Sequence, residues 1–269
     1  MTRVSRTRML ATIFVLAVLA AIPTLTLANH SWGSYHWART SNPFTLKVGD
    51  NVTSAWDAYL NEAIADWSAS TVLNLTKVTG GTTGRQCKPT AGRIEACNAA
   101  YGFNGWLGIA QIWASGNHIT QATTKLNDSY YNTATYNTPA WRRLVMCQEI
   151  AHDFGLDHQD EVFDNANLGS CMDYTNSPAG NEHPNAHDFE QLLTIYGHLD
   201  STTTIGAALP ASAPPAMNQI DFSGPKQWGR VIGGARSPMG NLVSTHELDF
   251  GNGNKVITHV FWALEGHGR

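Results

Sequence analysis

Residues 138–155 form the segment that most constrains how this chain can fold. Thr138 can cap the start of a helix, and Pro139 suits its first turn. Gly155 can end that helix by adopting a positive φ, a conformation in which other residues are strained. The intervening sequence has no further glycine or proline. The sequence therefore predicts one helix over residues 138–155 that ends at a sharp turn.

The end of this predicted helix gathers side chains that suit a metal ion. Gln148 and His152 are four residues apart and share a helix face, and Glu149 lies beside them. Because the chain turns at Gly155, His158 can swing back toward the same point. Two imidazole nitrogens and one further donor could then hold a metal from one side, leaving the other side open to water and substrate.

The segment resembles the signature of the metzincin superfamily of zinc peptidases, HExxHxxGxxH followed by a methionine turn. Every fixed position is present except the first histidine, which is Gln148 in this chain. Downstream, "SCMDY" at 170–174 is similar to the SxMxY methionine turn of astacins and serralysins. The resemblance covers residues 36–200. It implies that Met172 lies beneath the metal as a structural residue and that Tyr174 reaches the metal or the oxyanion.

The same resemblance implies a zinc site and a hydrolytic mechanism. The implied ligands are Gln148, His152 and His158. A glutamine amide oxygen is a weaker zinc donor than imidazole, so we expect a lowered metal affinity. Zinc lowers the pKa of its water toward about 7, and Glu149 then acts as the general base. Tyr174 could complete the metal shell or donate a hydrogen bond to the developing oxyanion.

Other polar residues are weaker candidates for the site. Asp153 and Asp157 are expected either to face solvent or to orient a histidine from behind. His246 and His259 lie near the C-terminal end and have no partner at metal-ligand spacing. The sequence therefore gives these two histidines no role in the predicted centre.

Four cysteines suggest two disulfides, although four cysteines allow three pairings. Cys87 and Cys97 are close in sequence, so they are expected to close a local loop. That leaves Cys147 with Cys171, a bridge that would tie the predicted helix to the methionine segment. The loop-entropy model gives such a closure roughly 3 kcal/mol of stabilisation. A zinc site built from the cysteines is disfavoured because the chain has no CxxC spacing.

The N-terminal residues 1–28 have the pattern of a secretory signal. Arg3, Arg6 and Arg8 precede an apolar run, and small residues allow cleavage after Ala28. A membrane anchor is the alternative, but the run is shorter than the roughly 20 residues of a membrane span. The remaining chain has fourteen basic and twenty-one acidic residues, a formal charge of −7 without a basic run. This balance argues against a nucleic-acid partner.

The hydrophobic patterns predict an α/β (α+β) layer arrangement. The resemblance implies that this fold is of the metzincin-like zincin type, with a twisted mixed sheet, an active-site helix and a C-terminal helix. An amphipathic helix is expected over residues 54–70, and the C-terminal helix within 177–199. Strands are expected over residues 72–78, 105–114 and 118–127, the last near a sheet edge or a substrate groove because its pattern is polar.

Composition divides the chain into four parts. A catalytic domain is expected over residues 29–200, after the signal at 1–28. Residues 201–219 are rich in Ala, Pro, Ser and Thr, as linkers are. Residues 220–269 form a small β-rich extension, with a hairpin over 248–264 that turns at "NGN".

Together these features predict a secreted zinc metalloendopeptidase that acts on protein or peptide substrates. After signal cleavage it is expected to be a monomer with no membrane partner. The alternative is a catalytically impaired metzincin fold that serves as a secreted binding module. The presence of Glu149, Gly155, His158 and the SxMxY element favours the enzyme, whereas Gln148 favours the binding module.

Overall fold

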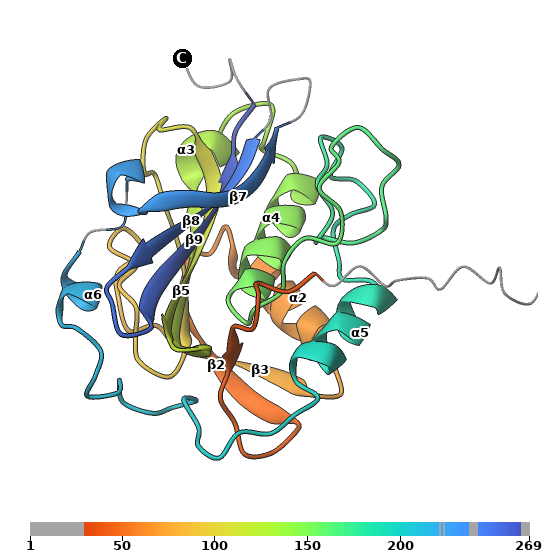
Figure 1. Ribbon diagram of the computed structural model, residues 1–269. Helices are drawn as coiled ribbons and strands as arrows, with labels where there is room; N and C mark the ends of the chain where they lie inside the picture. The colour runs from red at the N-terminus through yellow and green to blue at the C-terminus, as the bar shows by residue number, and fades with distance from the viewer. Residues whose placement is uncertain (1–29, 221, 223, 237–241, 265–269) are drawn as a thin grey trace, which may run out of the picture.

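A single mixed sheet organises the residues that the structure describes (Figure 1). The computed structural model describes residues 30–220, 222, 224–236 and 242–264, so the predicted signal, residues 1–28, lies outside them. The strand order is β3-β2-β4-β6-β5-β9-β8-β7, and β1 pairs with β6 beside this path. The strands are β1 (His36–Trp37), β2 (Phe44–Asn51), β3 (Leu73–Thr79), β4 (Ile94–Ala99), β5 (Trp106–Ser115), β6 (His118–Asn127), β7 (Arg230–Arg236), β8 (Leu242–Asp249) and β9 (Asn254–Trp262).

The sheet changes from parallel to antiparallel pairing at β5. Strand β2 is parallel to β3 and β4, and β6 is parallel to β4 and β1. Strand β5 is antiparallel to β6, and β9, β8 and β7 continue antiparallel from it. Parallel neighbours need a crossover connection, which α2 (Asp57–Trp67) supplies between β2 and β3. The predicted α/β class is confirmed.

Helix α4 (Pro139–His152) packs beside α2 on one face of the sheet (Figure 1). It begins as the sequence predicts, because the Thr138 side chain accepts a hydrogen bond from the Trp141 amide. The turn after it is also as predicted, since Gly155 has φ 93°. The other helices are α3 (Asp128–Tyr131), α5 (Ala186–Ile195), α6 (Ala216–Gln219) and the 3-10 helix η1 (Pro225–Gln227).

Most predicted elements form, with two differences. Helices α2, α4 and α5 and strands β3, β5 and β6 lie within or close to the predicted ranges, and β8 and β9 form the predicted hairpin. Strands β2 and β4 were not predicted. The expectation that β6 lies at a sheet edge was wrong, because β6 lies between β4 and β5. Its residues 119–127 are all buried.

The C-terminal strands continue the same sheet, and β9 pairs directly with β5. Side chains alternate between the two faces of a strand. Ile257 and Phe261 belong to the main hydrophobic core together with residues of α4, whereas Val256 and Val260 belong to a second cluster. His259 shares the alternation of Ile257 and Phe261. Its side chain therefore lies on the face that α4 covers.

Two disulfides form with the predicted pairing. Cys87 is bonded to Cys97, and Cys147 is bonded to Cys171. Cys147 lies on α4, so the second bridge fastens this helix to the segment that carries the methionine motif.

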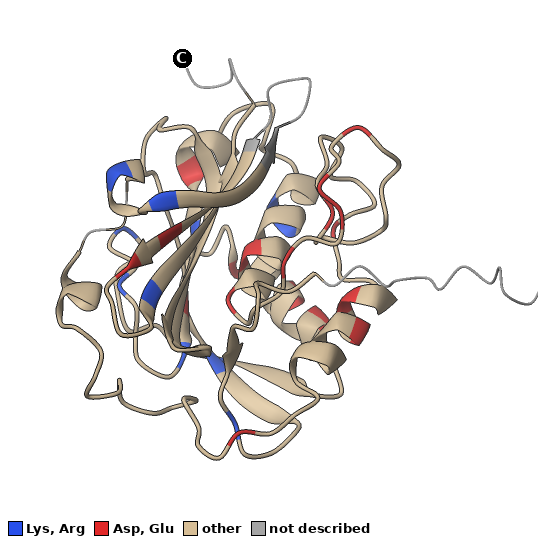
Figure 2. Ribbon diagram, viewed as in Figure 1, with Lys and Arg blue, Asp and Glu red and all other residues tan. Residues whose placement is uncertain are grey.

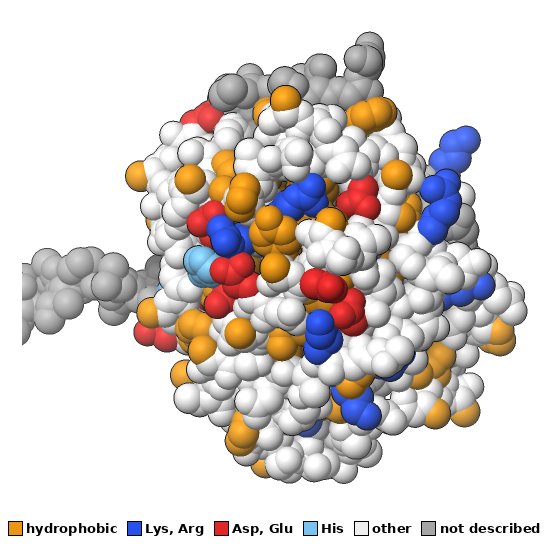
Figure 3. Space-filling view, turned by 180° about the vertical axis from the view of Figure 1, so that it is seen from behind, with side chains coloured by type: hydrophobic (Ala, Val, Ile, Leu, Met, Phe, Trp, Pro, Cys, Tyr) orange, Lys and Arg blue, Asp and Glu red, His pale blue; other side chains and the backbone are white. Residues whose placement is uncertain are grey.

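Charged residues are spread over several elements of the described chain (Figure 2). On the face shown in Figure 3, hydrophobic side chains lie in small groups between acidic and basic ones. No helix within the described residues has the length and apolar character needed to cross a membrane. The surface is therefore mixed in character, in keeping with 17 basic and 21 acidic residues in the whole chain.

The cap of α4 gives a test of the fold. Replacing Thr138→Ala removes the hydroxyl that accepts from the Trp141 amide. We expect the free energy of unfolding to fall by about 1 kcal/mol, because one helix N–H loses its partner. Urea denaturation measures the change. Thr138→Ser keeps a hydroxyl and should stay near the wild-type value; an equal loss in both variants would show that the hydroxyl is not the cause.

Candidate metal centre

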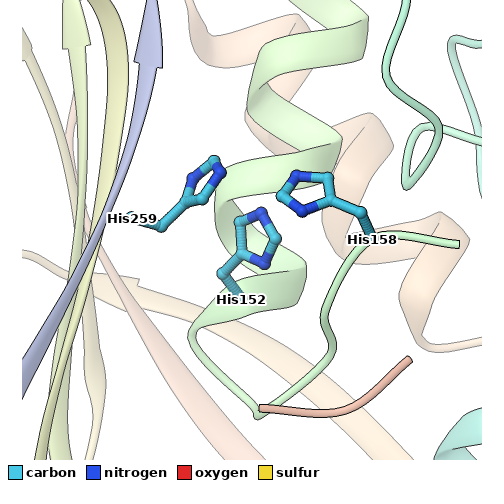
Figure 4. A group of neighbouring side chains, drawn as sticks. All are labelled: His152, His158 and His259. Atoms are coloured by element: carbon cyan, nitrogen blue, oxygen red, sulfur yellow. The ribbon is translucent and has the colours of Figure 1, made fainter. Parts of the chain in front are cut away.

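Three histidines from separate parts of the chain point toward one another (Figure 4). His152 is the last residue of α4, His158 lies in the loop after it, and His259 lies on β9. One ligand nitrogen from each lies within 4.8 Å of the other two. His152 and His259 are fully buried, and His158 is 5% exposed. The cluster thus has the residue types and spacing of a histidine metal site.

Each of the three imidazoles is held from behind through its Nδ1 atom. The acceptors are Leu156 O for His152 at 2.8 Å, Asp157 Oδ1 for His158 at 3.2 Å, and Glu149 Oε2 for His259 at 3.1 Å. An Nδ1 that faces an acceptor carries the proton of a neutral imidazole, so the lone pair is on Nε2. This is the arrangement by which outer partners orient metal-binding histidines.

The Nε2 atoms of His152, His158 and His259 have no hydrogen-bond partner among the described residues, although all three atoms are buried. Burial, with the neighbouring His259 and His158 imidazoles, lowers the pKa of His152 well below its usual value. Burial and the His259 imidazole likewise lower the pKa of His158. Neutral imidazoles with bare, inward-facing nitrogens are the form that binds a divalent metal, so the donor set fits zinc.

Glu149 supports this cluster through one carboxylate oxygen. Its Oε2 accepts from His259 Nδ1, whereas its Oε1 is buried without a hydrogen-bond partner among the described residues. Burial raises the pKa of Glu149. A Cβ added at Gly108 of β5 would lie 2.8 Å from Glu149 Oε1 and 2.6 Å from Val145 Cγ1. The absence of a side chain at Gly108 therefore leaves the space that the Glu149 carboxylate occupies.

Gln148 has a hydrogen bond that the sequence does not indicate. The side chain is buried, and its amide nitrogen donates to Cys171 O at 2.8 Å. The amide oxygen is buried without a hydrogen-bond partner among the described residues. The hydrogen bond to Cys171 links α4 to the methionine segment, next to the disulfide that joins the same two segments.

The methionine segment packs beside the cluster, where Tyr174 contacts His158. Met172 is fully buried in the main core, and its amide donates to Ser170 Oγ at 2.9 Å. Ser170 in turn donates to Asp188 of α5 at 2.6 Å, which fixes the segment. The Tyr174 ring centroid lies 3.9 Å from that of His158. The tyrosine therefore lies against a histidine of the cluster, and burial raises its pKa well above the usual value.

The two aspartates next to the motif differ in role. Asp157 orients His158 from behind, which was one of the two expectations for it. Asp153 is fully buried, so the expectation that it faces solvent was wrong; its carboxylate accepts from Thr124 of β6 at 2.7 Å. Burial raises the pKa of Asp153 well above its usual value.

Residues near the start of the described chain cover the cluster. The Trp32 amide donates to Gly155 O at 2.9 Å, and the Trp32 ring stacks on His152 at 4.7 Å between centroids. A Cβ at Gly155 would lie 2.3 Å from Tyr35 O, so only glycine allows this close approach. The turn after α4 therefore both redirects the chain toward His158 and accommodates the N-terminal segment.

His259 is the residue of the cluster that sequence reasoning missed. It is 110 residues from Glu149 in the chain, so no local spacing connects the two. The available signal was the alternation in "VITHVFW", in which a histidine stands between Ile257 and Phe261 on a hydrophobic face. A polar residue at such a position needs a partner in the core.

The chain resembles solved structures at low sequence identity. No protein-family model matches the chain, and no curated protein matches it. One similar solved structure is that of myroilysin, with 14% identity and a TM-score of 0.35 over 62% of this chain and 98% of that chain. Another is a hatching enzyme zinc-protease from the medaka fish Oryzias latipes, with 10% identity and a TM-score of 0.35 over 62% of this chain and 96% of that chain.

Removing His259 tests which residue completes the centre. We expect His259→Ala to lower the bound zinc by one ion per chain, because two imidazoles hold zinc weakly. Gln148→Leu, which removes the amide oxygen, should keep that ion. Elemental analysis after equilibrium dialysis measures both.

His246→Ala is the matched control, because His246 is also a buried histidine of the C-terminal hairpin, but its Nε2 contacts Ser244 Oγ at 2.9 Å. Its zinc content should match the wild type. Loss of the ion in Gln148→Leu, with retention in His259→Ala, would instead identify the glutamine as the ligand.

Proposed function

We propose that this chain is a secreted, zinc-dependent peptidase of the metzincin type, in which His259 takes the ligand role expected at position 148. The observation that carries the proposal is the convergence of three buried, unpartnered Nε2 atoms, with His152 and His158 at the positions that the metzincin signature assigns to ligands. The two disulfides agree with an oxidising, extracellular location.

His152, His158 and His259 would hold the metal, and their Nδ1 partners fix each ring in position. When bound, zinc supplies a Lewis acid that polarises a peptide carbonyl and lowers the pKa of a coordinated water. Three protein ligands leave one position of a tetrahedral zinc shell for water or substrate, which is the pattern of catalytic rather than structural zinc sites.

Glu149 would have two roles in this reaction. Its Oε2 orients His259, and its Oε1 remains available as the general base. In the proposed mechanism, Oε1 accepts a proton from the attacking water and later delivers it to the leaving amine. Tyr174, whose ring lies against His158, would donate to the oxyanion that develops on the carbonyl oxygen.

Glu149→Gln separates the proposed general-base role of Glu149 from its hydrogen bond to His259. The glutamine oxygen can still accept from His259 Nδ1, so we expect the zinc content to be retained. The amide cannot take up a proton, so kcat on a casein-type substrate should fall by at least about 100-fold. Glu190→Gln, on the exposed side of α5, is the control and should leave kcat unchanged. Unchanged cleavage by Glu149→Gln would remove the glutamate from the mechanism.

A second candidate function is a metal-stabilised binding module without peptidase activity. Two observations favour it. The three histidines are buried, with Trp32 stacked on one of them. In addition, β9 already pairs with the edge of β5, where an extended peptide could otherwise add as a strand. In this case the ion would hold β9 against α4 and contribute to folding.

Metal removal distinguishes the two functions. For the peptidase, we expect zinc-loaded protein to digest casein and a chelator such as 1,10-phenanthroline to abolish the digestion. For the binding module, chelation would lower the melting temperature because binding to the folded state alone stabilises it. Zinc-dependent melting with no cleavage by the zinc-loaded wild type would favour the binding module over the peptidase.

A further inference from the structure

A second group of histidines surrounds Asp200 on the far side of the N-terminal segment. His36 lies on β1, His118 is the first residue of β6, and His198 and Asp200 lie in the segment after α5. His36, His198 and Asp200 each offer a ligand atom within 4.8 Å of the other two. His118 contacts the same carboxylate oxygen as His36 does.

The distances in this group match the geometry of a tetrahedral metal shell. Asp200 Oδ1 lies 3.3 Å from His36 Nε2, 3.3 Å from His118 Nε2 and 3.8 Å from His198 Nε2. His36 Nε2 and His198 Nε2 are 3.2 Å apart. Ligand bonds of about 2.0–2.1 Å to tetrahedral zinc place neighbouring donor atoms roughly 3.3 Å apart. One ion could therefore bind between His36, His198 and Asp200 with little movement, whereas His118 would have to move closer to the other two imidazoles.

The hydrogen bonds around the group hold its central atoms facing one another. His36 Nδ1 lies 2.8 Å from Ser34 O, so it carries the proton and leaves a lone pair on Nε2. Asp200 Oδ2 accepts from the Arg39 amide and guanidinium at 3.1 and 2.9 Å. The guanidinium holds the carboxylate in place and leaves Oδ1 facing the imidazoles. In the imidazolium form, His36 Nε2–H donates to Asp200 Oδ1; in the neutral form, a metal ion can take the place of that proton.

We propose that His36, His198 and Asp200, with His118 as the fourth donor, form a second binding site for a divalent transition metal, which fastens β1 to the segment after α5. Imidazole nitrogens with one carboxylate suit zinc and its neighbours in the first transition row, whereas calcium and magnesium prefer oxygen donors alone. With His118 added through its contact to the same Asp200 oxygen, the protein would supply four donors, which is the number found in structural zinc sites.

The surroundings of the group allow an ion to enter from solvent, and an ion bound there would fasten distant parts of the chain together. The His118 and His198 side chains are 37% and 52% exposed, whereas those of His36 and Asp200 are 8% and 11% exposed. A cavity of about 380 Å³ borders His36 and His198. His36 and Asp200 are 164 residues apart in the chain, so an ion that joins them closes a long loop. It would also hold in place the segment that carries Trp32 over the first centre.

The test uses the full chain with His259→Ala, so that the first centre does not contribute. We expect this variant to bind one Co²⁺ or Zn²⁺ ion per chain at the second site. The Co²⁺ form should show the visible absorption of tetrahedral Co²⁺. Adding His198→Ala should weaken this binding by more than about 100-fold, beyond the effect of losing an outer partner. Adding His118→Ala instead should also weaken it. Both side chains are partly exposed, so neither change disturbs the core.

His183→Ala in the same background is the matched control. His183 is 48% exposed and contacts two carboxylates, Asp66 and Glu62, but it is outside both histidine groups. Its Co²⁺ affinity should equal that of the His259→Ala parent. Equal affinity in the His198→Ala variant, or no Co²⁺ binding by the parent, would overturn the proposal. Neither result bears on the first centre, because that centre is tested by the difference in zinc content between the wild-type chain and His259→Ala.

Discussion

The pairing of β9 with β5 is the interaction on which the cluster of His152, His158 and His259 depends. It places His259 opposite Ala110 and turns its side chain toward α4, where Glu149 accepts from its Nδ1. A slip of one residue in this register would move His259 to the other face of the sheet, because side chains alternate. Helix α4 and the sheet therefore supply complementary parts of one site, and neither is sufficient alone.

A metal-binding role would explain why the Nε2 atoms of the three histidines can be buried away from water. Burying an unpaired polar group is costly, and most buried polar groups in proteins have a partner. Here the Nδ1 atoms of the three histidines have hydrogen-bond partners, but the Nε2 atoms have none among the residues that the structure describes. Three such atoms facing one another make sense as a preformed ligand set, since a cation satisfies all of them at once. The N-terminal segment and the C-terminal strand both contribute to excluding water from this point.

The sequence predicted the local parts of this arrangement and missed the long-range part. Helix α4, its Thr138 cap and the turn at Gly155 follow from residue types within a few positions, so they could be predicted. Strand β4 could not, because the buried Glu95 interrupts its hydrophobic pattern. Strand β2 does carry a signal, the alternation of Phe44, Leu46 and Val48 with polar residues. The role of His259 depends on strand order, which no spacing in the sequence encodes.

The separation of Glu149 and His259 by 110 residues affects how the centre can assemble. His152 and His158 can meet as soon as α4 and its turn form, because the contacts between them are local. The third imidazole arrives only when β9 docks on β5. Tight metal binding would therefore require the complete sheet. A partly folded chain in which β9 has separated from β5 would release its metal before its helices unfold.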